Sequence, residues 1–220
     1  MAYIDFVGAV HTSTPRDYLL RVTEADKAEC AEKAIQWDYD YWDGDRKTGY
    51  GGFYYDGRWR PVAEIMAKHY GLPNNARILD VGCGKGFLLY EFTQVLPDCE
   101  IVGLDISDYA IEHAKDEVKP VLEKGDAASL PYGDSSFDFV VSITTLHNLL
   151  IGPMVSAFSE IERVARSDKH ITVEAYRNER EKMNMMYWQL TCRALHMPEE
   201  WEWIMDQAGY TGDHGFIYFE

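Results

Sequence analysis

The stretch RILDVGCGKG, residues 77–86, decides how this chain folds. Its first five residues form a short, mainly apolar run, and this pattern predicts a buried strand. Gly82, Gly84 and Gly86 follow at every second position, and a helical pattern begins at Lys85. Glycine has no side chain, so such a turn lets the backbone approach a ligand, and the free N–H groups of the helix start face the same point. The stretch therefore predicts a strand, a ligand-binding turn and a helix.

Acidic residues stand at the ends of three successive apolar runs. Asp80 precedes the glycine turn, Asp105 ends the second run, and Asp126 ends the third, with Ala127 after it. A single acid at a strand end is usually a helix cap or a solvated group. The carboxyl ends of parallel strands lie on one rim of a sheet, where such folds bind ligands. Three acids on that rim, beside a glycine turn, favour a ligand of the nucleotide type.

Short apolar runs alternate with helical patterns along residues 75–176. The predicted strands cover 77–81, 100–105, 121–126, 137–143, 171–176 and 216–219, and the predicted helices cover 85–96, 108–118 (capped by Ser107), 153–166, 179–195 and 198–208. This alternation implies βαβ crossovers. We therefore expect an α/β fold with a doubly wound, mostly parallel sheet and helices on both faces.

The first 72 residues have a different composition, and we expect them to form an N-terminal cap on a core over 73–220, all in one compact unit. A helix is predicted over 23–37, with Thr23 as its cap, and a second over 61–70. Between them, residues 37–59 contain nine aromatic residues, five glycines and five aspartates. This mixture indicates a structured loop that covers a ligand site. The alternative is a dimer surface.

Charge and cysteine content exclude several classes of function. The 220 residues contain 21 Lys and Arg against 37 Asp and Glu, a net charge of -16. Nucleic acids and anionic membranes bind basic surfaces, so neither is expected as a partner. The N-terminus lacks a basic segment, so no signal peptide is expected, and no apolar run approaches the roughly 18 residues of a membrane span. The four cysteines show no metal-site or disulfide spacing, which favours free thiols, no metal and a cytoplasmic location.

The acid in front of the turn distinguishes between nucleotide ligands. Dinucleotide enzymes use the spacing G-x-G-x-x-G, whereas this chain has G-x-G-x-G with Asp80 two residues before it. A carboxylate at this position would repel the negative charge of a diphosphate, but it suits a ligand with an ammonium and a sulfonium group. A dinucleotide oxidoreductase therefore remains only a remote alternative.

Four motifs in order resemble those of class I S-adenosylmethionine-dependent methyltransferases. They are DVGCGKG at 80–86, GLDIS at 103–107, GDAASLPY at 125–132 and SFDFV at 136–140. The resemblance extends from about residue 76 to 176 and includes the helical segment AFSEIERVA at 157–165. It implies a seven-stranded sheet, with S-adenosylmethionine as methyl donor and S-adenosylhomocysteine as product.

The resemblance also implies roles for individual residues. It places Asp80 near the methionine amino group, Asp105 on the ribose, and Asp126 with Ala127 at the adenine. The three glycines of the turn lie beneath the cofactor. The remaining predicted cofactor-binding residues are Cys83, Ile106, Ile143 and Tyr50. Lys85, at the helix start, is expected to point into solvent.

The acceptor is expected beyond the fourth and fifth predicted strands. His147 is the first candidate for a catalytic proton acceptor because imidazole titrates near neutral pH. Glu174 is the second and Tyr55 the third, and catalysis by proximity alone stays open. The predicted substrate-pocket residues are Tyr54, Tyr55, Trp59, Asn148, Tyr176 and Arg177.

The favoured function is methyl transfer to an O or N atom of a small molecule, such as a natural product, a sugar or another metabolite. One alternative is a non-catalytic protein that binds S-adenosylmethionine or S-adenosylhomocysteine. Another is a methyltransferase that acts on proteins. The chain is expected to be a monomer or a homodimer.

Overall fold

A single sheet of six strands forms the centre of the computed structural model, which describes residues 1–12 and 15–220. The strands are β1 (Arg77–Val81), β2 (Glu100–Asp105), β3 (Leu122–Lys124), β4 (Phe137–Ile143), β5 (Ala165–Glu174) and β6 (Asp213–Ile217). Their order is β3-β2-β1-β4-β5-β6, and each neighbouring pair is parallel. The expected doubly wound α/β fold is confirmed, with six strands in the described part of the chain instead of seven.

The outer edge of β6 is covered by the start of the chain. The Ile4 amide donates to the His214 carbonyl at 2.7 Å, and the His214 amide donates to the Ala2 carbonyl at 3.0 Å. Tyr3 forms a parallel bridge with His214. The N-terminal segment thus hydrogen-bonds to the backbone of His214 on the outer edge of β6. Such edge groups are otherwise free to pair with another strand.

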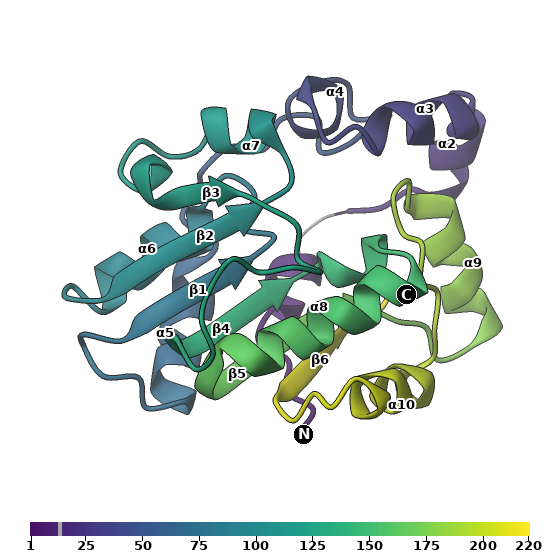
Figure 1. Ribbon diagram of the computed structural model, residues 1–220. Helices are drawn as coiled ribbons and strands as arrows, with labels where there is room; N and C mark the ends of the chain where they lie inside the picture. Colours follow the sequence, from purple (N-terminus) through teal and green to yellow (C-terminus); the bar gives the residue numbers. More distant parts are fainter. Residues whose placement is uncertain (13–14) are drawn as a thin grey trace.

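Helices cover both faces of the sheet (Figure 1). The helices of the structure are α1 (Gly8–Thr12), α2 (Tyr18–Thr23), α3 (Lys27–Ala34), α4 (Tyr39–Trp42), α5 (Arg60–His69), α6 (Phe87–Val95), α7 (Asp108–Glu112), α8 (Ile151–Val164), α9 (Glu179–Trp188) and α10 (Pro198–Gln207), with short 3-10 turns at Lys119–Val121 and Leu146–Asn148. In Figure 1 the helices α2, α3 and α4 lie beyond the arrowheads of the strands, at the carboxyl rim of the sheet.

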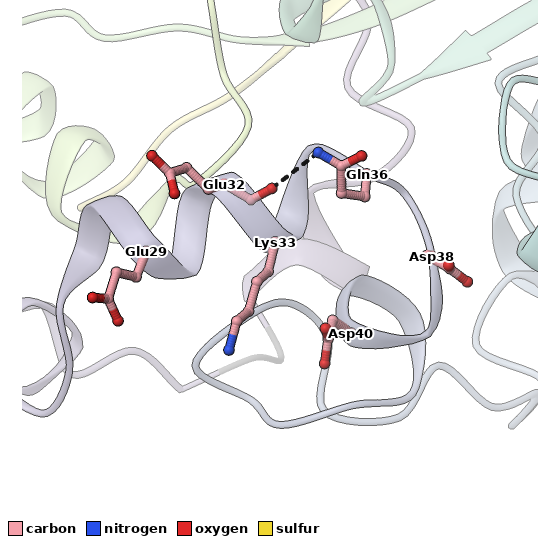
Figure 2. A pocket seen from close by; sticks show the side chains of 6 residues that line it. All are labelled: Glu29, Glu32, Lys33, Gln36, Asp38 and Asp40. Atoms are coloured by element: carbon pink, nitrogen blue, oxygen red, sulfur yellow. Dashed lines mark hydrogen bonds between the residues drawn. The ribbon is translucent and has the colours of Figure 1, made fainter.

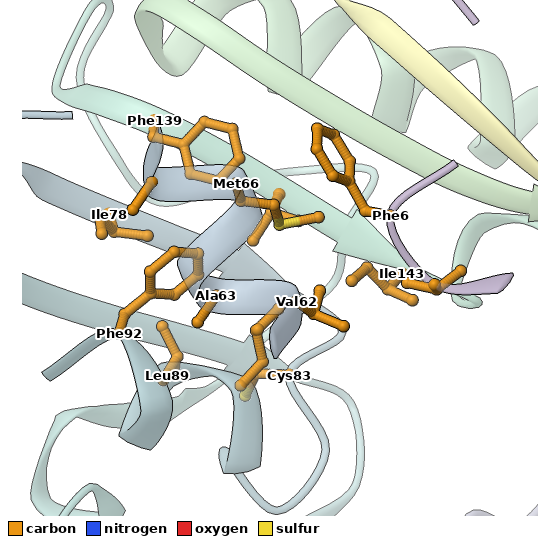
Figure 3. Packing of buried hydrophobic residues seen from close by; sticks show 14 of the residues in the cluster. Phe6, Val62, Ala63, Met66, Ile78, Cys83, Leu89, Phe92, Phe139 and Ile143 are labelled. Carbon is orange, nitrogen blue, oxygen red and sulfur yellow. The ribbon is translucent and has the colours of Figure 1, made fainter. Parts of the chain in front are cut away.

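Two apolar clusters hold the layers together. Along β4, Phe139 and Val141 face the cluster formed with α5 and α6, while Val140 faces the cluster formed with α8 and α10. Figure 3 shows the first cluster, in which Phe6 from the N-terminus packs with Met66 of α5 and with the sheet. Because both faces of these strands are buried, apolar residues follow one another along them without alternating with polar ones.

Several predicted helix boundaries were wrong. The helix expected over 23–37 is divided into α2 and α3, because Asp26 caps a new helix start by accepting from the amides of Ala28 and Glu29. Ser107 caps α7 as expected, but the helix ends at Glu112. The helix expected over 179–195 ends at Trp188, after which the backbone becomes extended.

The described residues contain no helix that is both long and apolar enough to cross a membrane. All four cysteines are free thiols, as predicted.

Candidate active site

A cavity of about 740 Å³ lies at the carboxyl rim of the sheet, between the core and the N-terminal segment. Asp80, Asp105, Ile143 and Glu174 line it from four different strands. A second hollow of about 460 Å³ is formed only by α3 and the residues after it, and its lining is Glu29, Glu32, Lys33, Gln36, Asp38 and Asp40 (Figure 2). The first cavity is the candidate site because it contains the glycine turn.

The glycine turn forms part of the cavity wall through Gly82 and Gly84. Both have positive φ, +81° and +54°, which disfavours other residues. A Cβ atom on Gly82 would lie 2.1 Å from Oγ1 of Thr145, and one on Gly84 would lie 2.8 Å from the Trp42 ring. Gly86 is not among the lining residues of this cavity in the described chain, and a Cβ there would lie 2.7 Å from Val118. Gly86 therefore serves the packing of the helix start.

Two buried carboxyl groups flank the turn. Asp105 accepts from the amide of Gly84 at 2.7 Å and from that of Ser107 at 2.8 Å. Burial and the neighbouring Asp105 raise the pKa of Asp80 to about 8. Burial also raises the pKa of Asp105. A cationic group bound beside these acids would favour their charged forms. The site therefore fits a ligand that carries an ammonium and a sulfonium group.

The remaining predicted cofactor residues also lie along this cavity. The lining includes Cys83, Ile106, Asp126, Ala127, Ile143 and Tyr50. Asp126 orders its own turn by accepting from the Ala128 amide at 2.9 Å. The structure thus brings together every predicted cofactor residue except Gly86 around one space.

The aromatic loop packs against the glycine turn. Trp42 is buried, and its indole N–H donates to Oγ of Ser107 at 3.0 Å. Lys85 was predicted to point into solvent, and this was wrong. Its ammonium is buried and pairs with Asp43 at 2.7 Å, because the folded loop brings a carboxylate above the helix start.

His147 and Glu174 face each other in the cavity wall. Nε2 of His147 lies 3.5 Å from Oε2 of Glu174, and both side chains are buried. Burial lowers the pKa of His147 to about 3 and raises that of Glu174 to about 8. Nδ1 of His147 and Oε2 of Glu174 have no hydrogen-bond partner within the described residues. Buried polar atoms without partners are costly, so these two indicate a place for a polar ligand.

The predicted substrate-pocket residues fall into two groups. Tyr54, Trp59 and Asn148 line the cavity. The other three lie elsewhere in the described structure: Tyr55 donates to Glu91 at 2.7 Å, Arg177 pairs with Glu181 at 2.6 Å, and Tyr176 packs in the apolar core.

Sequence reasoning missed three arginines of the cavity wall, Arg16, Arg21 and Arg46. They lie around Trp188, the last residue of α9. No spacing rule connects residues 16–46 with residue 188, so only the tertiary structure could reveal this group.

A protein-family model described as a methyltransferase domain matches residues 72–209, more than half of the chain. The chain belongs to this methyltransferase family. The expected class, S-adenosylmethionine-dependent methyltransferases of class I, is thereby confirmed.

Individual relatives agree with this assignment. The chain is 34% identical over 114 residues to a demethylmenaquinone methyltransferase of Roseiflexus sp. and 33% identical over 146 residues to that of Roseiflexus castenholzii. These matches cover 50% and 64% of this chain but only 46% and 57% of the relatives, so the chain spans about half of their length. In fold, it resembles the YcgJ protein of Bacillus subtilis, with a TM-score of 0.54, 22% identity and 66% of each chain covered.

Proposed function

We propose that this methyltransferase-family protein transfers a methyl group from S-adenosylmethionine to an O or N atom of a small acceptor molecule. The observation that carries the proposal is the continuity of one cavity, which runs from the glycine turn and its two acids to the buried pair His147 and Glu174. The proposed donor site and a polar group that can accept a proton thus share one cavity.

S-adenosylmethionine, when bound, supplies an electrophilic methyl group on a sulfonium. Asp80 and Asp105 would hold its cationic and ribose parts, and Gly82 and Gly84 would leave room for it. Ile106, Asp126 and Ala127 would form the adenine end of the site. Burial raises the pKa of both acids in the free protein, and a bound cation would favour their ionised carboxylates.

His147 is proposed as the proton acceptor. Burial lowers its pKa to about 3, not the near-neutral value expected from the sequence, so the imidazole is a weaker base than free imidazole but is neutral near pH 7 and has a free electron pair on one ring nitrogen. Glu174 lies beside the ring and would orient it, while Gln189 donates to the other carboxylate oxygen. Asn148 would shape the wall rather than bind a proton, since its amide donates to the carbonyls of Thr144 and Thr145.

Residues 1–72 are proposed to act as a cap that excludes water from the reaction. Trp42 contacts Gly84, and Phe53 stacks on Phe87 at a ring distance of 5.1 Å. Excluding water and aligning the two substrates are the main tasks of an enzyme that catalyses a displacement at carbon. A small molecule is the proposed acceptor because the cavity lies between this cap and the core, and because the relatives above are named as demethylmenaquinone methyltransferases.

Calorimetry and a labelled donor test the proposal. The full chain should bind S-adenosylhomocysteine but not NAD, and Asp105→Asn should weaken that binding, since hydrogen bonds to a charged group contribute roughly 1.5–3 kcal/mol. Asp98→Asn, on an exposed loop, is the matched control. Radiolabelled S-adenosylmethionine incubated with a metabolite extract should then label a small molecule. Binding without transfer to any acceptor would favour a non-catalytic binding protein.

A further inference from the structure

Three guanidinium groups surround one indole ring in the wall of the same cavity. The centres of Arg16, Arg21 and Arg46 lie 5.4, 5.3 and 5.2 Å from the Trp188 ring centroid. Arg16 also lies 5.2 Å from the ring of Phe219. All five residues line the cavity. Such a concentration of positive charge is unexpected in a chain with a net charge of -16.

Arg21 and Arg46 are held by backbone carbonyls rather than by carboxylates. Within the described residues, the hydrogen bonds of Arg21 and Arg46 go to backbone carbonyls: Arg21 donates to Trp188 and Arg46, and Arg46 donates to Gly49 and Tyr50. Glu24 and Asp45 act on Arg21 only at longer range. Arg16 donates to the carbonyl of His11 at 3.3 Å and lies within electrostatic range of Glu174.

The arginines are also partly removed from water. Burial lowers the pKa of Arg16, Arg21 and Arg46. Guanidinium groups remain charged even so, and they bind carboxylates and phosphates through paired N–H donors. Aromatic side chains beside them provide a flat apolar surface for the rest of a ligand.

We infer that Arg16, Arg21 and Arg46 form an anion-binding subsite, so that the methyl acceptor is a small molecule with a carboxylate or phosphate group. The inference rests on the function proposed above and specifies its substrate class. The oxyanion would lie among the guanidinium groups, with the apolar part of the acceptor against Trp188. The rest of the acceptor would lie in the cavity that His147 and Glu174 also line.

Matched charged and neutral probes test this inference. Benzoate, phenyl phosphate and neutral benzamide are titrated into the full chain saturated with S-adenosylhomocysteine. At least one anionic probe should bind about tenfold or more tightly than benzamide, since a charged hydrogen-bonded partner in a desolvated site contributes strongly. Comparing the two anions distinguishes a carboxylate from a phosphate acceptor.

Arginine variants then locate the binding. Arg16→Gln and Arg46→Gln should each weaken anion binding about tenfold, whereas Arg46→Lys should retain part of it. Arg58→Gln is the control, because Arg58 lines the same cavity but already pairs with Asp56 at 2.6 Å. Circular dichroism checks that each variant is folded.

The possible results separate the inference from the proposed function. Failure of the wild-type chain to bind S-adenosylhomocysteine would contradict the proposed function. Normal S-adenosylhomocysteine binding with equal affinity for benzoate, phenyl phosphate and benzamide would overturn the anion subsite alone. Loss of S-adenosylhomocysteine affinity in the Arg16 and Arg46 variants, without preferential anion binding, would also overturn it and assign the arginines to the carboxylate of the donor.

Discussion

The ammonium group of Lys85 lies 2.7 Å from both carboxylate oxygens of Asp43. The pair joins the helix start of the core to the aromatic loop of the N-terminal cap. Tyr109 donates to the same carboxylate at 3.0 Å, and the Phe53 amide donates to it at 3.1 Å. Asp43 is therefore one of the points at which core and cap are connected.

Lys85→Met should destabilise the protein and loosen the cap. Removing one partner of a buried pair costs roughly 3–5 kcal/mol, and we expect the lower end because Asp43 is partly exposed. Denaturant unfolding measures the loss, and limited proteolysis should show faster cleavage within residues 37–59. Lys124→Met is the control, since its pair with Asp108 is exposed and should contribute at most about 1 kcal/mol. Equal effects of the two variants would show that the buried pair does not hold the cap.

Gly84→Ala should weaken binding of S-adenosylhomocysteine because its new Cβ would displace Trp42. Gly209→Ala is a close control, since Gly209 also has positive φ, +74°, but has open space around it. Both variants should lose roughly 1–2 kcal/mol of stability from the left-handed backbone. Calorimetry should show a loss of affinity only for Gly84→Ala, and unchanged affinity would place the ligand away from the turn.

Binding of S-adenosylhomocysteine should release protons near pH 7. Burial and Asp105 raise the pKa of Asp80 to about 8, so the free protein holds a proton there at neutral pH. The ammonium group of the ligand favours the ionised carboxylate and expels that proton. Calorimetry in buffers of different ionisation enthalpy measures the release. Asp80→Asn should abolish it, and a binding enthalpy independent of buffer in the wild-type chain would contradict the assignment.

Glu174 should make the protein less stable as the pH rises from about 4.5 to about 8. Burial raises its pKa from 4.5 to about 8, so the folded chain holds a proton that the unfolded chain loses in this window. The free energy of unfolding therefore falls with pH over this range, and the penalty is complete above pH 8. Glu174→Gln should be more stable relative to wild type at pH 8 than at pH 5, as measured by urea unfolding. Glu100→Gln, at an exposed position, should show no such difference.

His147→Ala should lower the rate of methyl transfer about 100-fold if His147 is the proton acceptor. Affinity for S-adenosylhomocysteine should stay the same, because the residue lies at the acceptor side. His113→Ala is the control: His113 is exposed, and its replacement should leave the rate of methyl transfer unchanged. A decrease of only a few fold for His147→Ala would transfer the role to Glu174 or leave alignment of the substrates as the main cause of catalysis.

The residues of the proposed donor site could be brought together from sequence alone because their determinants are local. Gly82 and Gly84 belong to one turn, and Asp80 and Asp105 end neighbouring parallel strands. Strand ends meet at one rim in any doubly wound sheet, so the order of apolar runs already places these residues together. The fold class follows from the same alternation of strands and helices.

Other features depend on contacts between distant parts of the chain, and only the tertiary structure decided them. The start of the chain covers the edge of β6, the cap brings Asp43 to Lys85, and three separate segments bring Arg16, Arg21 and Arg46 to Trp188. Local sequence patterns report the period and the ends of helices and strands. They carry no information on which exposed faces will pack together, because that choice depends on the shape and charge of surfaces that exist only in the folded molecule.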